Sequence, residues 1–104
     1  MATPLSLNTD QRDDGTFVVV ATGEIDLSNL DSFAEALSAA TRDGAMLTVD
    51  LGGVEYLDSG ALRALFANAD RIHVIANPVL MPVLKISGLT DVASVESAPP
   101  PAER

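Results

Sequence analysis

Two predicted strands on either side of an amphipathic segment limit what this chain can fold into. Phe17 to Ala21 is a β-branched run apolar enough to be covered on both faces, and Met46 to Leu51 is the next strand. A strand, a helix and a second strand in this order predict a parallel pair joined by a right-handed crossover, and hence an α/β fold. The helical spacing of the segment between the two strands is carried by Leu30, Phe33, Leu37 and Ala40.

Other segments extend the predicted sheet. Polar and apolar residues alternate over residues 5–9, and the Asp14-Gly15 turn that follows predicts an antiparallel partner for the strand at Phe17. Residues 71–76 predict a fourth strand, and residues 92–95 predict a last strand at the edge. The expected architecture is a single α/β domain with a mixed sheet of four to five strands and three main helices.

Helix-capping residue types mark where the helices should begin. Ser28, with Asp31 three positions later, predicts the start of the first helix as a capping box. Ser59 is the expected N-cap of the second helix. Asn77 is expected to cap the third helix, with Pro78 at its favoured first position.

The second and third helices should pack differently. The third is apolar nearly all round from Val79 to Leu84, and Pro82 within it predicts a helix that is bent or begins late. Its apolar surface has two interpretations, either deep burial or an exposed strip that serves dimerisation or a second partner. The second helix is expected to bury Leu62, Leu65, Phe66 and Ala69.

Length and composition bound the class of protein. The chain has 104 residues, which suits one domain, expected over residues 1–96. Residues 97–104 are polar, contain three consecutive prolines and predict a disordered tail. Cysteine is absent, which excludes disulfides and thiolate metal sites. The first residues lack the features of a signal peptide, and no apolar run reaches the ~20 residues of a membrane span, so the expected location is cytoplasmic.

The charge of the chain narrows its partners. Fifteen acidic and six basic residues give a net charge of −9. We expect neither nucleic acid nor an anionic membrane as a partner, because such a surface repels phosphate groups. The charge has two interpretations, either solubility alone or steering toward a basic patch on a partner protein.

The residues needed for catalysis are scarce. His73 is the only histidine and lies in an apolar run, where a structural role is favoured over a catalytic one. No histidine pair or cysteine could hold zinc, and no glycine-rich nucleotide motif is present. The sequence therefore predicts no catalytic residues, no metal and no cofactor, and a function in binding another protein.

The segment from Asp50 to Leu62 places a hydroxyl after a carboxylate at the entrance of the second helix. Ser59 follows Asp58 there, and its hydroxyl could cap the helix. A helix N-terminus also tolerates a phosphate, because its free amides and its dipole favour negative charge. Ser59 is therefore a phosphorylation candidate, and phosphorylation would add up to about two negative charges.

Three short motifs resemble the STAS family, the fold of bacterial anti-sigma factor antagonists. The resemblance covers about residues 5–96 and implies the family's mixed sheet with helices. Its motifs are Gly23-Glu24-Ile25-Asp26, the run from Asp50-Leu51 to Asp58-Ser59, and Asn77-Pro78 followed by Ser87-Gly88-Leu89.

The resemblance implies a partner switch. In such systems the unphosphorylated antagonist binds an anti-sigma factor that is also a serine kinase, and phosphorylation of the antagonist ends the interaction. Carried over to this chain, the partner-binding face would comprise Glu24, Asp26, Ser28, Asp58, Ser59, Gly60 and Arg63.

The match breaks at the phosphoacceptor. The family's loop usually reads Asp-Ser-Ser-Gly-Leu with the second serine as acceptor, and here that position holds Gly60, which has no hydroxyl. Either Ser59 takes over as acceptor or the protein is not phosphorylated, and we favour the second interpretation. Two other functions remain open, namely a STAS regulatory subunit of a membrane transport system and a nucleotide- or small-ligand-binding sensor.

Overall fold

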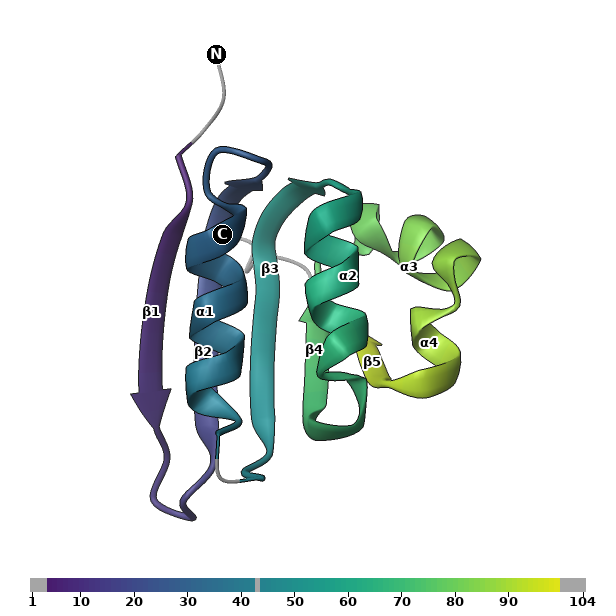
Figure 1. Cartoon of the computed structure of the whole chain (residues 1–104). Helices are drawn as coiled ribbons and strands as arrows, with labels where there is room; N and C mark the ends of the chain where they lie inside the picture. Colours follow the sequence, from purple (N-terminus) through teal and green to yellow (C-terminus); the bar gives the residue numbers. More distant parts are fainter. Residues whose placement is uncertain (1–3, 43, 100–104) are drawn as a thin grey trace, which may run out of the picture.

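The computed structural model describes residues 4–42 and 44–99, and five strands and four α-helices lie within them (Figure 1). The strands are β1 (Ser6–Gln11), β2 (Phe17–Ile25), β3 (Leu47–Leu57), β4 (Ile72–Ala76) and β5 (Ser94–Ser97). The α-helices are α1 (Leu30–Ala40), α2 (Ser59–Ala67), α3 (Met81–Ser87) and α4 (Leu89–Val92), and two short 3-10 helices are η1 (Ala69–Arg71) and η2 (Pro78–Leu80).

The strands form one mixed sheet in the order β1-β2-β3-β4-β5. β1 is antiparallel to β2, and β2 to β5 are mutually parallel. Each parallel connection advances the sheet in the same direction, so right-handed crossovers place the connecting helices on one face. Figure 1 shows this arrangement, with α1 and α2 in front of the sheet. The predicted α/β class and the antiparallel first pair are confirmed.

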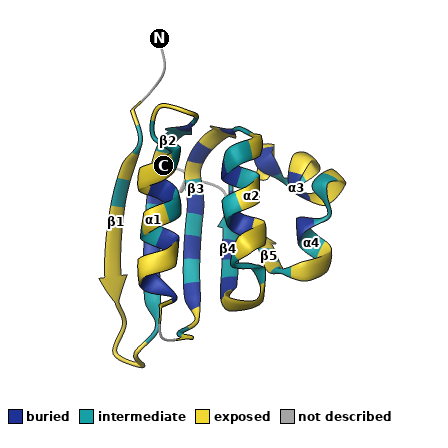
Figure 2. Cartoon of the chain, viewed as in Figure 1, coloured by how far each residue is buried: buried dark blue, intermediate teal, exposed yellow. Residues whose placement is uncertain are grey.

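The core lies between the sheet and its helices. Inward-facing residues of the central strands, such as Val19, Val49 and Val74, are fully buried, and they pack against Phe33 and Leu37 of α1. Figure 2, in which the ribbon is coloured by burial, shows the buried residues along the central strands and on α1 and α2. The apolar stripe predicted for the first helix is thus the stripe that packs on the sheet.

The two central strands are longer than the sequence pattern predicts. β2 continues past Ala21 to Ile25, and β3 continues through Gly52-Gly53 to Leu57. Register shifts between the strands accommodate the glycines. At Gly53 a Cβ would lie 2.7 Å from the Cγ2 atom of Thr22, so only glycine lets the strands approach this closely.

Gly23 is a second position in β2 that requires glycine. Its φ is +100°, in the left-handed region, and a Cβ there would collide with the backbone carbonyl of Pro4. The glycine therefore lets the segment before β1 lie close beside β2.

Two of the three predicted caps are wrong. Asn29, not Ser28, precedes the first residue of α1, and its side chain makes no capping bond to the helix. Asp58, not Ser59, is the N-cap of α2, because its carboxylate accepts a hydrogen bond from the Ala61 amide. A carboxylate that directly precedes the helix fills the capping position and leaves the serine as the first helical residue.

The third cap and the late start of the third helix are confirmed. The side-chain oxygen of Asn77 accepts a hydrogen bond from the Val79 amide, and Pro78 opens η2. The α-helical part begins only at Met81, so Pro82 lies in its first turn, where a missing amide hydrogen costs no helix bond.

The predicted burial of α2 and the predicted last strand need correction. In α2, Phe66 is 38% exposed, whereas the smaller Ala61 is fully buried. Ala69 lies beyond α2, in η1. Val92 ends a short helix, α4, that the sequence pattern did not indicate, and the edge strand begins at Ser94. That strand includes Ser97, which we expected in the tail; residues 100–104 lie outside the described residues.

The apolar segment of the third helix is divided between core and surface. Leu80 and Leu84 are buried, whereas Val79, Val83 and Ile86 are exposed. The interpretation of deep burial is therefore wrong for the outer face, which presents an apolar strip. Within the described part of the chain, no helix is long and apolar enough to cross a membrane.

Candidate protein-binding site

The loops that follow β2 and β3 meet at the same edge of the sheet. Ile25 and Leu57 are paired at the carboxyl ends of these parallel strands, and the Asp58 amide donates to the Ile25 carbonyl at 3.1 Å. Both loops then lead into helices on the same face, α1 and α2 (Figure 1). The two sequence motifs of the predicted binding face are therefore side by side.

The first loop, from Asp26 to Asn29, is a tight turn held by side chains from both of its ends. The Asn29 amide donates to the Asp26 carbonyl at 3.1 Å, and the Asn29 side-chain oxygen accepts from the Asp26 amide at 3.0 Å. The Asn29 side-chain nitrogen donates to the Glu24 carbonyl at 2.9 Å. The Asp26 carboxylate accepts from both the amide and the hydroxyl of Ser28. These bonds fix the loop's conformation.

The second loop is held by Asp58. Its carboxylate accepts from the Ala61 amide at 3.1 Å, and its carbonyl accepts from the Leu62 amide at 3.2 Å. Ser59 is exposed at the first position of α2, and Arg63 is exposed one turn later. The phosphorylation candidate is therefore accessible and does not serve as the cap.

Gly60, at the position where the family carries its acceptor serine, packs against α1. A Cβ at this position would lie 2.5 Å from the Cδ2 atom of Leu30, the first residue of α1. The lack of a side chain at Gly60 is thus matched by a leucine that fills the adjacent space.

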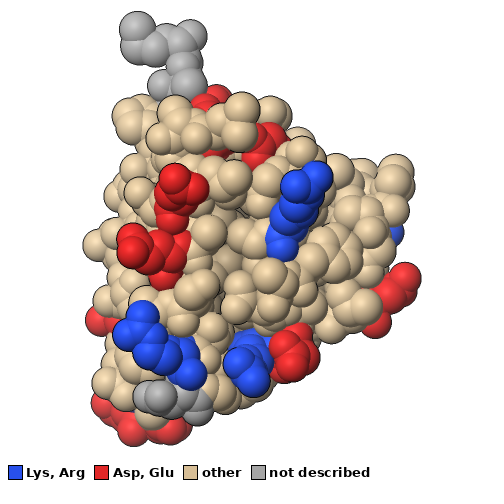
Figure 3. All heavy atoms as spheres, viewed as in Figure 1, with Lys and Arg blue, Asp and Glu red and all other residues tan. Residues whose placement is uncertain are grey.

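The structure places the seven predicted partner-binding residues around this edge, three at the end of β2 and on the first loop, and four from Asp58 into the first two turns of α2. Glu24, Asp26 and Asp58 are half-buried, whereas Ser28, Ser59 and Arg63 are exposed. On the face shown in Figure 3, acidic side chains lie over α1, and basic side chains lie over α2 and at the lower end of α1. Glu24, Asp26 and Asp58 give this edge negative charge, and the exposed Arg63 adds one positive charge.

Sequence reasoning missed two residues of this site. Asn29 fastens the first loop, although asparagine at a helix start was a readable signal. Leu27, at the tip of the loop, is 83% exposed. An exposed leucine leaves no periodic signal, because its neighbours belong to a turn rather than to a helix or strand.

A shallow pocket of ≈ 310 Å³ lies on the strands near the first loop and bears on the small-ligand interpretation. It is lined by Thr22, Gly23, Glu24, Gly53 and Glu55. Two glutamates and no basic side chain line it, so its charge is unfavourable for the phosphates of a nucleotide.

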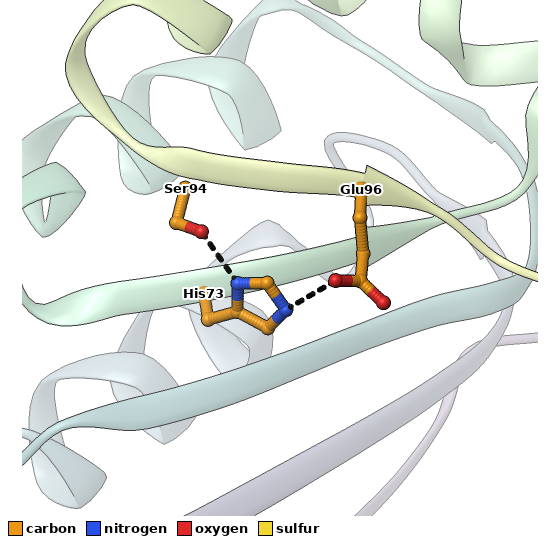
Figure 4. Close-up of polar contacts among 3 residues, drawn as sticks. All are labelled: His73, Ser94 and Glu96. Atoms are coloured by element: carbon orange, nitrogen blue, oxygen red, sulfur yellow. Dashed lines mark hydrogen bonds and ion pairs between the residues drawn. The ribbon is translucent and has the colours of Figure 1, made fainter.

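His73 makes polar contacts away from this site, on the sheet face opposite the helices. Its Nδ1 lies 2.7 Å from the Ser94 hydroxyl, and its Nε2 lies 3.1 Å from a carboxylate oxygen of Glu96 (Figure 4). The histidine therefore joins β4 to the edge strand β5, as expected for a structural residue. Among the described residues, no group of three or more His, Cys, Asp or Glu side chains could hold a metal ion.

Comparison of the sequence with models of known protein families gives a match over most of the chain. The family model described as "Mlab, STAS domain" matches residues 8–93. The chain belongs to the STAS domain family.

Solved structures agree with this assignment. An anti-sigma factor antagonist from Mycobacterium paratuberculosis is 26% identical with a TM-score of 0.81, and the match covers 93% of this chain and 87% of that one. The Bacillus cell fate determinant SpoIIAA in its phosphorylated form is 21% identical with a TM-score of 0.61, covering 90% and 92% of the two chains. The unphosphorylated form of SpoIIAA is 21% identical with a TM-score of 0.64, and the match covers 90% of this chain and 89% of that one. No curated protein matches the sequence significantly.

Proposed function

We propose that this chain is an anti-sigma factor antagonist, a protein-binding module that sequesters an anti-sigma factor of the serine kinase type. The observation that carries the proposal is the likeness to the Mycobacterium paratuberculosis antagonist, which extends over 93% of this chain. The paired loops at the ends of β2 and β3 support it, because they present the residues of the family's binding motifs on one surface.

In this proposal the binding face comprises Glu24, Asp26, Ser28, Asp58, Ser59, Gly60 and Arg63. Its first loop is fixed by internal hydrogen bonds before any partner arrives. A preorganised loop loses little conformational entropy on binding, which favours affinity. The chain needs no catalytic group, metal or cofactor for this function, and its partner and place of action would be cytoplasmic.

Control by phosphorylation is the part of the family mechanism that we do not carry over. Gly60 has no hydroxyl, and Leu30 occupies the space beside it. Ser59 is exposed, but it stands one position before the family's acceptor. We therefore propose an antagonist that binds constitutively, and its regulation would lie in its abundance or in a ligand.

The test begins with capture of partners from native lysate of the source organism, followed by binding of the purified anti-sigma factor. The expected partner is an anti-sigma factor kinase, and Ser59→Ala should leave its affinity unchanged. Ser59→Glu should weaken binding, because the larger side chain occupies the space where the partner packs at the start of α2, and its carboxylate loses water there. Recovery of transport ATPase or permease subunits in place of an anti-sigma factor would refute the proposal in favour of the transport interpretation.

Phosphopeptide mapping after incubation with that kinase and ATP tests the constitutive mode separately. We expect no phosphate on the chain and intact binding. Stoichiometric phosphate on Ser59, with loss of binding, would restore the full family switch.

The exposed apolar strip on η2 and α3 supports a further proposal, a homodimer formed through Val79, Val83 and Ile86. Sedimentation measurements over a range of concentrations test it, with Ile86→Glu as the variant that should dissociate a dimer. A monomer at every concentration would contradict it.

A further inference from the structure

Leu27 is exposed because the hydrogen-bonded turn around it holds its side chain in the solvent. It is the first central residue of the turn from Asp26 to Asn29, and 83% of its surface is accessible. The Asn29 side chain bonds to both arms of the loop, and the Asp26 carboxylate closes on Ser28. The turn cannot fold its leucine inward without breaking several of these bonds.

Acidic residues lie beside Leu27 in the chain and on the paired second loop, and one basic residue, Arg63, lies on the same face. Asp26 precedes it, Asp31 lies in the first turn of α1, and Asp58 is joined to the end of β2 by a backbone bond. An isolated exposed leucine needs no explanation by itself. A leucine at the tip of a rigid turn, among carboxylates and beside a candidate binding edge, has the composition of an interface anchor with a polar rim.

We propose that Leu27 is the apolar anchor of the binding site, and that its partner is a protein surface with an apolar pocket bordered by lysine or arginine side chains. This inference rests on the proposed function and specifies the chemistry of the partner. The basic border pairs with Asp26, Asp31 and Asp58, while the leucine is removed from water in the pocket.

The exposed apolar strip of the third helix lacks this charge pattern. Ile86 is 87% exposed on α3, but the segment from Pro78 to Gly88 contains Lys85 and no acidic residue. Met46 is 51% exposed and precedes β3, at the opposite end from the site. With 11 residues in β3, that end is about 35 Å away. Met46 therefore provides the matched control, and Ile86 tests the alternative of an anchor on α3.

The first test measures the affinity of the purified anti-sigma factor kinase for Leu27→Ala, Met46→Ala and Ile86→Ala by calorimetry. Leu27→Ala should weaken binding about tenfold or more, whereas Met46→Ala should leave it unchanged. Raising the salt concentration should slow association, because the carboxylates steer a basic partner. If the kinase binds the wild type and Leu27→Ala equally, the inference is overturned and the proposed function stands. A loss in Ile86→Ala alone would place the anchor on α3 and also overturn it.

A second test does not depend on the kinase. An amphipathic synthetic peptide, with leucines on one face bordered by arginines, is titrated into the isotope-labelled protein and followed by amide chemical shifts. We expect shifts centred on the turn from Asp26 to Asn29 that are lost in Leu27→Ala, and little effect from a peptide with glutamates in place of the arginines. Shifts confined to α3, or unchanged in Leu27→Ala, would overturn the inference. If no anti-sigma factor binds the protein, the proposed function fails. The peptide titration alone then decides whether Leu27 is an apolar anchor.

Discussion

Replacement of Asp58 by alanine tests the construction of the candidate site at its second loop. The Asp58 carboxylate accepts the Ala61 amide at 3.1 Å and is the only side chain that caps α2 within the described residues. Loss of such a cap costs about 1 kcal/mol, with a range of about 0.5 to 2 kcal/mol. For a domain of this size that corresponds to a fall of about 4 to 8 °C in Tm.

Two variants at the same loop sharpen this test. Ser59→Ala should change the free energy of unfolding by less than about 0.5 kcal/mol, because the exposed serine does not cap the helix. Asp58→Asn should lose less than Asp58→Ala, because asparagine also caps helices and only the charge is removed. Urea denaturation with a shared m-value gives the three free energies. A larger loss in Ser59→Ala than in Asp58→Ala would refute the assignment of the cap.

Three other expectations follow from particular contacts. Gly60→Ser should destabilise the fold by about 1 kcal/mol, because the new Cβ displaces Leu30, and it should cost less in a Leu30→Ala background. Equal costs in the two backgrounds, measured by thermal denaturation, would show that the two residues do not contact. Gly23→Ala should cost more than about 2 kcal/mol in the same assay, since it combines a left-handed φ with a backbone collision. A neutral result would contradict the close approach of Pro4 to β2. Hydrogen bonds from the amide and hydroxyl of Thr16 lower the pKa of Asp14 below its ordinary value of 3.8. The contribution of Asp14 to stability is therefore present above pH 3.8 and is lost as the pH falls through the lowered pKa. An NMR titration midpoint at or above 3.8 would contradict this.

Periodicity predicted the sheet because buried strands and helices have few ways to pack. The runs at Phe17 and Met46 could only be covered strands, and the stripe through Phe33 and Leu37 could only face them. The antiparallel first pair followed from the turn at Asp14-Gly15, where the structure has its hairpin loop. These inferences needed no knowledge of distant contacts.

The errors arose where neighbouring positions compete for one role. Ser59 and Asp58 are both good capping types, and only the exact start of α2 decides between them. In the same helix the buried stripe is centred on Ala61 and Leu65, and the large Phe66 lies at its exposed margin. Hydrophobicity favours the phenylalanine, but a helix that approaches the sheet closely requires a small residue at the contact.

The strand ends were misjudged for a related reason. Gly52-Gly53 has the composition of a turn, yet it lies within β3 as a place of close approach to β2. Which meaning a glycine pair has depends on the neighbouring strand, and that information is not local in the sequence. The position of the candidate site was nevertheless predictable, because both of its motifs follow parallel strands.

The order of the strands in the sheet has a consequence for biosynthesis. Each strand lies beside the one that precedes it in the chain, so no strand has to enter between two that are already paired. As the ribosome delivers the polypeptide, at about 5 to 20 residues per second, the sheet can grow from the β1 edge toward the β5 edge. At every stage of translation the nascent sheet then has a single growing edge, and the next strand to emerge is the one that pairs with it.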